Sequence, residues 1–409
     1  MIVRTAFKCL TCDQHHVVRI GMGHDAQQVH RFPCRGCGED MVVALNIDYE
    51  NLSTVPEAVE NAELTKEAPG ALVVNVHANY VIEGADRYTD MVFPHMLQMQ
   101  AQFEAAERFG SMRPVDFEKD LQERPRPFRR PDYADEWQLL KKAWSLHSRG
   151  REKLADKVMA EATKRFHFDE PLNHLPDWVW RFSMFLGATS YEVTLREMMD
   201  QVRQPRKDGA FKVLLVEHAK GSADRSHRYF GVFRDYFSAW SEFSQVHFAV
   251  AKGMPVMDGH VATTSGFNAV RMFYGNAFEA FASSVDLLAF MNNVLEGRDW
   301  RQFRNIDADT YLRSDKPKRF DAFLDRPGFG ALPAERDAQL RNASHHGALH
   351  HDAQRGVLTY REGKGNAGDT VELSYAEYLS RCSAMFFQIV TLLRFELLVC
   401  QITGTKYPV

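Results

Sequence analysis

The sequence of 409 residues lacks the short motifs by which many enzymes are recognised. It has no Gly-rich phosphate loop, no nucleotidyltransferase or protease motif and no repeat of fixed period. Nothing therefore indicates a P-loop enzyme, a protease or a solenoid. Its hydrophobic content of 45% and charged content of 25% are ordinary for a soluble globular protein. The length suffices for two or three domains with cores of their own.

An excess of one charge and long apolar runs are also missing. Lys and Arg total 50 against 54 Asp and Glu, and the net charge of −4 excludes a global polybasic field. The N-terminus has no apolar stretch long enough for a signal peptide. The most apolar run, residues 383–402, carries Arg394 and Glu396 near its centre, which argues against a membrane span. We therefore expect a cytoplasmic protein that has no contact with a membrane.

Cysteine is scarce, with six residues in the chain, but four of them form a pattern. Two C-x-x-C knuckles, C-L-T-C and C-R-G-C, are typical of a tetrahedral structural zinc site. The predicted ligands are Cys9, Cys12, Cys34 and Cys37. Disulfides are the alternative, but nothing marks the chain as secreted. The nearby histidines are not needed, because four thiolates already fill the site; they are His15, His16 and His24.

Short β-like runs around the knuckles predict a zinc ribbon in residues 1–47. A ribbon of this size binds nucleic acid, binds a protein or caps its neighbour, and its few scattered basic residues do not decide among these roles. Residues 48–90 are predicted to be a linker with one short β segment at 71–76. The reason is that residues 48–70 are acidic and rich in Pro and Glu.

Residues 91–259 are predicted to be a helical sensor or regulatory region, because apolar residues recur there at helical spacing. The aromatic residues at this spacing are more typical of a core than of a base-stacking platform. A basic, proline-broken loop at 123–131 either contacts a phosphate backbone or is a solvated tether. The predicted elements are a helix at 91–109, a helical hairpin at 135–166, two helices near 176–203, and single helices at 211–219 and 228–251.

Residues 260–409 are predicted to form a second helical domain. Its expected elements are a long helix at 264–296, a charged connector at 298–326, a β-hairpin at 356–360 and 369–373, and a final helix from Tyr375 to Cys400. The apolar stripe of the final helix is wide enough for two buried faces, so we expect it to contact a bundle and a dimer mate.

Between the connector and the hairpin lies the stretch L-R-N-A-S-H-H-G, on a helix predicted at 333–346. Pro333 suits the first helical turn and Gly347 suits the left-handed position just past the end. Asn342 and His346 are four residues apart and share a face. Arg341 and His346 are roughly 140° apart around the helix axis, so one subunit offers half a compact site.

The order R-N-x-x-x-H, followed by Gly and by a long hydrophobic C-terminal helix, resembles the HEPN superfamily of small helical-bundle ribonucleases from toxin–antitoxin and phage-defence systems. The resemblance implies a bundle in which two motif helices meet across a two-fold axis and cut RNA without a metal. Arg341 takes the place of the phosphate-clamping Arg, and His346 that of the proton-transferring His. Asn342 then orients the His or the phosphate. His345, four residues after Arg341, is the competing His, but the family spacing selects His346.

We therefore expect a mainly α protein with a small N-terminal β zinc ribbon, acting as a homodimeric endoribonuclease. It would cut cellular RNA, with tRNA as one candidate, when residues 91–259 sense a phage-derived or stress trigger in abortive infection. Zinc is expected to be structural, with no cofactor for catalysis. The alternatives are a solvated helix cap, a HEPN bundle that binds RNA or a partner without cutting, and a zinc-ribbon adaptor for nucleic acid. A last alternative is a metal site formed by His345, His346, His350, His351 and Asp352.

Overall fold

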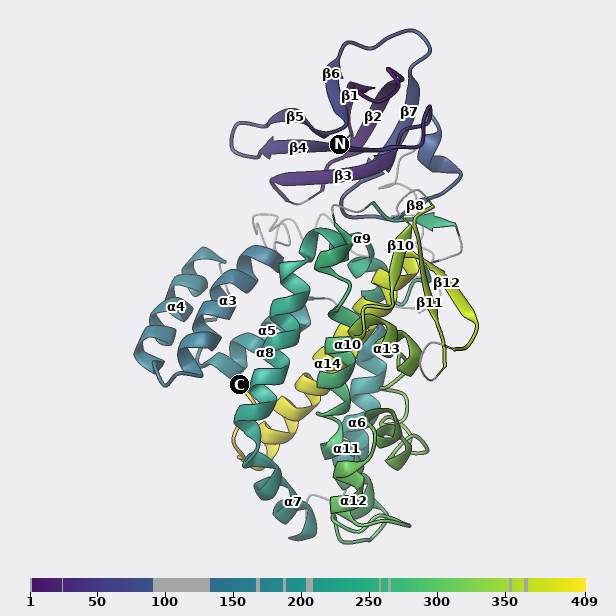
Figure 1. Cartoon of the computed structure of the whole chain (residues 1–409). Helices are drawn as coiled ribbons and strands as arrows, with labels where there is room; N and C mark the ends of the chain where they lie inside the picture. The colour runs from purple at the N-terminus through teal and green to yellow at the C-terminus, as the bar shows by residue number, and fades with distance from the viewer. Residues whose placement is uncertain are drawn as a thin grey trace, which may run out of the picture.

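The protein consists of a strand-rich N-terminal part and a helical body that follows it (Figure 1). This confirms, at the level of secondary structure, the expected mainly α layout with a small β part at the N-terminus. The predicted helix at 91–109 and the basic loop at 123–131 lie outside the described residues. The computed structural model describes residues 2–23, 25–90, 133–166, 170–186, 189–203, 209–256, 259–263, 266–352, 355–363 and 367–409.

Two sheets make up the N-terminal part. In the first, β1 (Ile2–Cys9) lies between β6 (Ala62–Thr65) and β2 (His15–Gly21), and β2 pairs in parallel with β7 (Leu72–His77). In the second, β4 (Asp40–Asp48) pairs antiparallel with β3 (Gln27–Pro33) and β5 (Ser53–Glu60). The two sheets share one apolar cluster, whose fully buried members include Phe7, Val18, Met41, Val43 and Val74.

The structure differs from the predicted linker at 48–70. β5 and β6 lie within this stretch and complete the two sheets, so the β part extends through β7 and does not end at residue 47. Both strands are sheet edges, and the outer residues Val55, Glu57 and Val59 of β5 are exposed. The acidic residues and the proline of β5 resemble a linker in composition, and an edge strand tolerates them because one of its sides has no neighbouring strand.

The helical body confirms several predicted elements. The hairpin at 135–166 is present as α3 and α4, and the predicted helices at 176–203 and 211–219 correspond to α5, α6 and α7. The helix predicted at 228–251 is divided at Ala239 into α8 and α9. Their bounds are Tyr133–His147 for α3, Glu152–Arg165 for α4, Leu175–Phe185 for α5, Glu192–Arg203 for α6, Gly209–Ala219 for α7, Ser222–Ser238 for α8 and Trp240–Ala251 for α9.

The final helix, α14 (Tyr375–Thr403), lies at the centre of the body and is buried over most of its length (Figure 1). One hydrophobic cluster extends from Trp137 to Val399, so the expected boundary at 259/260 does not divide the core. By length and composition α14 is apolar enough to cross a membrane, but 89% of its most apolar stretch is buried inside the protein. Two charged residues of this helix, Arg394 and Glu396, have ion-pair partners from other helices.

The single long helix predicted at 264–296 is not continuous. It is replaced by a short 3-10 helix (Phe267–Ala269), α10 (Phe273–Ala282) and α11 (Asp286–Leu295). At the break, the hydroxyl of Ser284 donates to the carbonyl of Ala280 at 2.8 Å, a side-chain bond that competes with helix continuation. The break places the side chain of Asp286 3.2 Å from the guanidinium of Arg319 in the connector.

The connector and hairpin complete the body. The connector contains α12 (Ala308–Arg313) and a 3-10 helix (Lys316–Ala322). The predicted hairpin is confirmed as β11 (Val357–Arg361) and β12 (Thr370–Ser374), and β10 (His350–Asp352) adds a third strand. The body also joins the β part directly, since β8 (Ile82–Glu83) pairs with β9 (His260–Val261).

Candidate functional site

The helix that carries the motif, α13 (Ala338–His345), is shorter than the predicted range 333–346. It begins at Asp337, whose carboxylate accepts hydrogen bonds from the backbone of Gln339 and Leu340 at 2.8 and 2.9 Å. This N-cap satisfies donors of the first turn, so the helix starts there and not at Pro333. The predicted end is confirmed: His346 is the C-cap residue and Gly347 has a φ of +67°.

The motif helix is fixed against α10 by a serine hydroxyl. Ser344 is fully buried, and its Oγ accepts from the backbone N–H of Gly275 at 3.2 Å and donates to the carbonyl of Arg271 at 2.6 Å. The hydroxyl of Tyr378 on α14 donates to the same carbonyl at 2.9 Å. These bonds join α10, α13 and α14, so the position of the motif depends on three helices that are far apart in sequence.

Arg341 is paired with a carboxylate that the motif does not include. Its Nε donates to Oε1 of Glu279 on α10 at 2.7 Å, and its Nη2 donates to the same oxygen. Its Nη1 donates to Oδ1 of Asn342 at 2.7 Å. The side chains of Arg341 and Glu279 are 24% and 29% exposed, so the pair lies at the surface and is reachable from solvent. The structure thus brings Arg341 and Asn342 together and adds Glu279.

His346 stands apart from this pair. It is exposed, and its ring has no hydrogen-bond partner among the described residues. The oxygen of Asn342 accepts from Arg341 and not from His346. Within one subunit, the predicted catalytic residues therefore form an Arg–Asn pair and a separate, accessible imidazole.

His345, the competing histidine, is held inside. Its ring occupies the space that a side chain at position 275 would fill, because a Cβ on Gly275 would lie 2.0 Å from its Cδ2. Its Nε2 is buried and has no hydrogen-bond partner among the described residues. This burial favours His346 over His345 as the residue that meets a substrate.

The structure does not gather the C-terminal histidines into a metal site. In the described part of the chain, the four N-terminal cysteines are the group of side chains close enough to hold a metal ion. His351 instead packs against Phe267 and Tyr375, with ring centroids 5.1 and 5.2 Å apart, and this burial lowers the pKa of its imidazole. His350 lies exposed on β10.

The predicted zinc ligands lie together at one end of the β part. Cys9 ends β1 and Cys34 follows β3, so the two knuckles come from different sheets. The Sγ atoms of Cys9 and Cys37 are 3.8 Å apart, those of Cys12 and Cys34 are 3.6 Å apart, and all four lie within 4.8 Å of one another. Zinc–sulfur bonds of about 2.3 Å in a tetrahedron place the sulfurs about 3.8 Å apart. The cluster therefore has the dimensions of a zinc site.

Both knuckles have the same backbone shape. The residue after each second cysteine is left-handed, Asp13 with a φ of 58° and Gly38 with a φ of 83°. Its N–H donates to the carbonyl of the first cysteine, at 3.0 Å for Cys9 and 2.9 Å for Cys34. Burial raises the pKa of Cys34 to about 12, so a thiolate there requires a cation beside it. Four converging thiols, one of which needs a cation beside its thiolate, fit a zinc ion.

Chemically, the two candidate sites are of different kinds. The cysteine cluster has four thiols and no additional ligand position, which suits a structural ion and not a reaction. The last turns of α13 carry an accessible imidazole, a guanidinium and an amide, which suit proton transfer and phosphate binding. No known protein family, curated protein or solved structure matches this chain in the comparisons made with each.

Proposed function

We propose that this protein is a metal-independent endoribonuclease of the HEPN type that acts as a homodimer. The observation that carries the proposal is the arrangement on α13, where His346 is exposed at the helix end and Arg341 is fixed at the surface one turn earlier. An exposed imidazole can act as a general base or as a general acid during phosphodiester cleavage.

The same geometry supports the proposed dimer. In one subunit the guanidinium of Arg341 is directed to Glu279 on α10, and no hydrogen bond links Arg341 or Asn342 with the ring of His346. A second copy placed against the motif helix would supply another imidazole and another guanidinium to one cleft. Two histidines are also what the chemistry needs, since one proton is removed and another is delivered.

The proposed reaction is an intramolecular transesterification of the RNA backbone. One His346 takes the proton of the ribose 2′-hydroxyl, and the 2′-oxygen attacks the adjacent phosphorus. The bond from phosphorus to the 5′-oxygen breaks, and the second His346 gives that oxygen a proton. The products are a 2′,3′-cyclic phosphate and a 5′-hydroxyl. The guanidinium of Arg341 stabilises the negative charge that builds on the phosphate oxygens.

The zinc ion that we propose for Cys9, Cys12, Cys34 and Cys37 is structural. It lies in the β part, whereas the motif lies in the helical body (Figure 1). The described helices between residues 133 and 251 are the proposed sensor for a phage-derived or stress trigger, because they share one core with the motif helix. A conformational change in that core would reach α13 through direct packing.

The test is cleavage of cellular RNA by the purified full-length protein in the presence of a chelator. We expect His346→Ala and Arg341→Ala to reduce the cleavage rate by roughly 100-fold or more, with the mass in solution unchanged. The matched control is His350→Ala, because His350 is also an exposed histidine close by but lies outside the motif. Full activity in His346→Ala, or equal losses in His346→Ala and His350→Ala, would refute the proposal.

A second candidate function, a HEPN bundle that binds RNA or a partner without cutting it, is favoured by one observation. The positive charge of Arg341 is already balanced by Glu279 in the single subunit. Growth arrest on expression, relieved by His346→Ala, would support the nuclease; RNA binding with no cleavage would support the binding module. The zinc-ribbon adaptor lacks comparable support, because three basic residues of the β part, Arg4, Lys8 and Arg31, are each paired with a glutamate.

A further inference from the structure

Arg271 precedes α10 and lies beside the end of the motif helix. Its carbonyl accepts the hydroxyls of Ser344 and Tyr378 at 2.6 and 2.9 Å, so its backbone is fixed by α13 and α14. A Cβ built on Gly347 would lie 3.7 Å from Nη2 of Arg271. The guanidinium therefore lies next to the residue that follows His346, outside the R-N-x-x-x-H motif.

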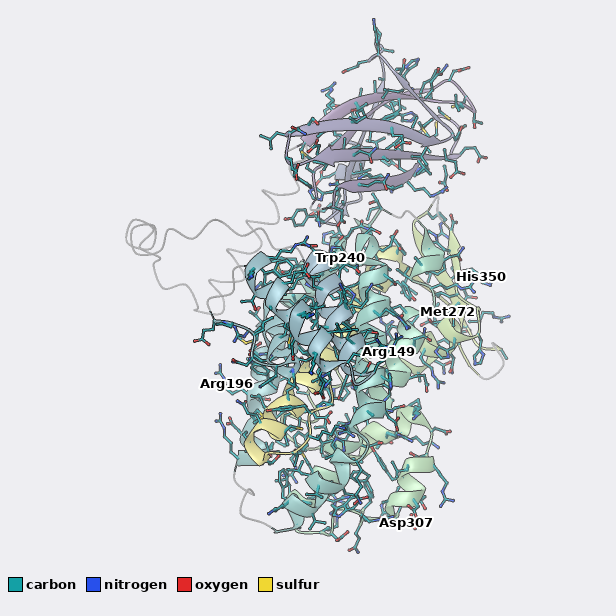
Figure 2. All side chains as sticks on the ribbon, turned by 90° about the vertical axis from the view of Figure 1, so that its left-hand side faces the viewer. Arg149, Arg196, Trp240, Met272, Asp307 and His350 are labelled. Carbon is teal, nitrogen blue, oxygen red and sulfur yellow. The ribbon has the colours of Figure 1, made fainter. Side chains whose placement is uncertain are left out.

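The contacts between α10 and α13 place Arg271 in line with the site. Arg341 faces Glu279, Ser344 faces Gly275, and Gly347 faces Arg271, so the two segments run antiparallel. Along α13 the contacts run from Arg341 to Gly347, the residue after His346. Along the other segment they run from Glu279 back to Arg271. Figure 2 shows Met272, the neighbour of Arg271, on the same side of the body as His350, with Arg196 on the opposite side.

Arg271 differs in its charge balance from three arginines of this region. Arg341 is paired with Glu279, Arg355 with Glu372, and Arg381 with both Glu335 and Asp337. In the described part of the chain, no carboxylate lies within ion-pair distance of Arg271. A phosphate that approaches a paired arginine must compete with its carboxylate, whereas a phosphate beside Arg271 meets no such competitor.

We propose that Arg271 is a second phosphate-binding residue of this site, which contacts the RNA backbone next to the bond being cut. The inference rests on the proposed function and adds to it a ligand contact that the motif does not contain. The planar guanidinium fits a phosphate through two parallel N–H donors. Gly347 has no side chain that would stand between this guanidinium and solvent at the end of α13.

The experiment measures binding of a short fluorescein-labelled RNA to the full-length protein by anisotropy, with His346→Ala as the background so that the RNA stays intact. We expect Arg271→Gln in this background to weaken binding roughly tenfold or more, the effect of one charge-assisted hydrogen bond. The slope of log Kd against the logarithm of the salt concentration should fall by about one, as expected for the loss of one phosphate contact. Arg271→Lys should recover part of the affinity, because lysine keeps the positive charge but lacks the two parallel N–H donors of the guanidinium.

The matched control is Arg196→Gln, because Arg196 is an exposed arginine of α6 on the opposite side of the body. Arg271→Gln keeps the carbonyl that Ser344 and Tyr378 bind, so the melting temperature should match that of the parent. Unchanged RNA affinity and salt dependence in Arg271→Gln would overturn the inference while leaving cleavage to be judged by His346→Ala. RNA binding that depends on Arg271 without cleavage by wild type would support the inference and refute the nuclease. No RNA binding at all would refute both.

Discussion

Arg341 of α13 and Glu279 of α10 face each other across the contact of the two helices, with Nε of the arginine 2.7 Å from Oε1 of the glutamate. The pair has two consequences. It fixes the guanidinium of the motif in one orientation, with Asn342 holding its other side. It also places a negative charge where the proposed reaction needs to bind a phosphate. In a single subunit, Glu279 would therefore compete with the phosphate for Arg341 and lower the cleavage rate.

The first prediction concerns this competition. Glu279→Gln keeps an oxygen for Nε of Arg341 but removes the negative charge, so we expect RNA cleavage by the full-length protein to rise several-fold. The unfolding free energy should fall by about 0.5–1 kcal/mol, because the pair is partly exposed. Initial rates and thermal melts measure the two effects. A loss of activity in Glu279→Gln would instead identify the carboxylate as a residue that positions Arg341 for the reaction.

The second prediction concerns the contact between Gly275 and His345. A Cβ at position 275 would lie 2.0 Å from the imidazole, so Gly275→Ala must displace the ring and with it the end of α13. We expect a loss of about 1–3 kcal/mol in the unfolding free energy and a loss of RNA cleavage. The control is Gly231→Ala in α8, where a Cβ meets no atom within 4 Å. There we expect a gain of about 0.5–1 kcal/mol, and equal effects in the two variants would contradict the prediction.

The third prediction concerns the metal. Cys34→Ser should abolish zinc binding, measured by elemental analysis, and lower the melting temperature, because the ion joins knuckles from two sheets. Cys400→Ser is the control, since the thiol of Cys400 is also buried but lies in α14, where it donates to the carbonyl of Lys406 at 3.4 Å. Removal of zinc by a chelator should lower the melting temperature and leave the cleavage rate per folded molecule unchanged. Zinc retained by Cys34→Ser would exclude the four-cysteine site.

The fourth prediction is a pH dependence of stability that arises at His247. Its Nε2–H donates to the carbonyl of Leu186 at 3.2 Å, and its Nδ1 accepts from the hydroxyl of Tyr236 at 3.0 Å. Burial lowers the pKa of this imidazole to about 3. The pKa of histidine in an unfolded chain is about 6.5. Between these values the unfolded chain binds a proton that the native protein does not, so stability falls as the pH falls below about 6.5.

At pH 5 this difference amounts to about 2 kcal/mol. His247→Gln should be less stable than wild type at neutral pH, since it loses two buried hydrogen bonds, but its melting temperature should fall less between pH 7 and pH 5. Zinc release on acidification affects both proteins alike and cancels in the comparison. Parallel losses in the two proteins would show that the imidazole is not the group responsible.

Several features were predictable because they depend on neighbours in the sequence. Gly347 ends the motif helix in the left-handed conformation, as its position after the last apolar turn indicates. The hairpin of α3 and α4 follows the spacing of apolar residues such as Trp137, Leu140 and Trp144, which are all buried. The strands at 48–70 were less predictable. They are edge strands, and their acidic composition does not reveal the backbone pairing that holds them in two sheets.

The sequence by itself determined the residues that chemistry would use: four cysteines in two knuckles, and an arginine, an asparagine and a histidine at helical spacing. Tertiary structure alone decided how they are held. It paired Arg341 with Glu279, enclosed His345 against Gly275, left His346 exposed and placed Arg271 beside Gly347. The physical reason is that spacing along a helix fixes which side chains share a face, whereas the charge and space that each one meets come from a different helix packed against it.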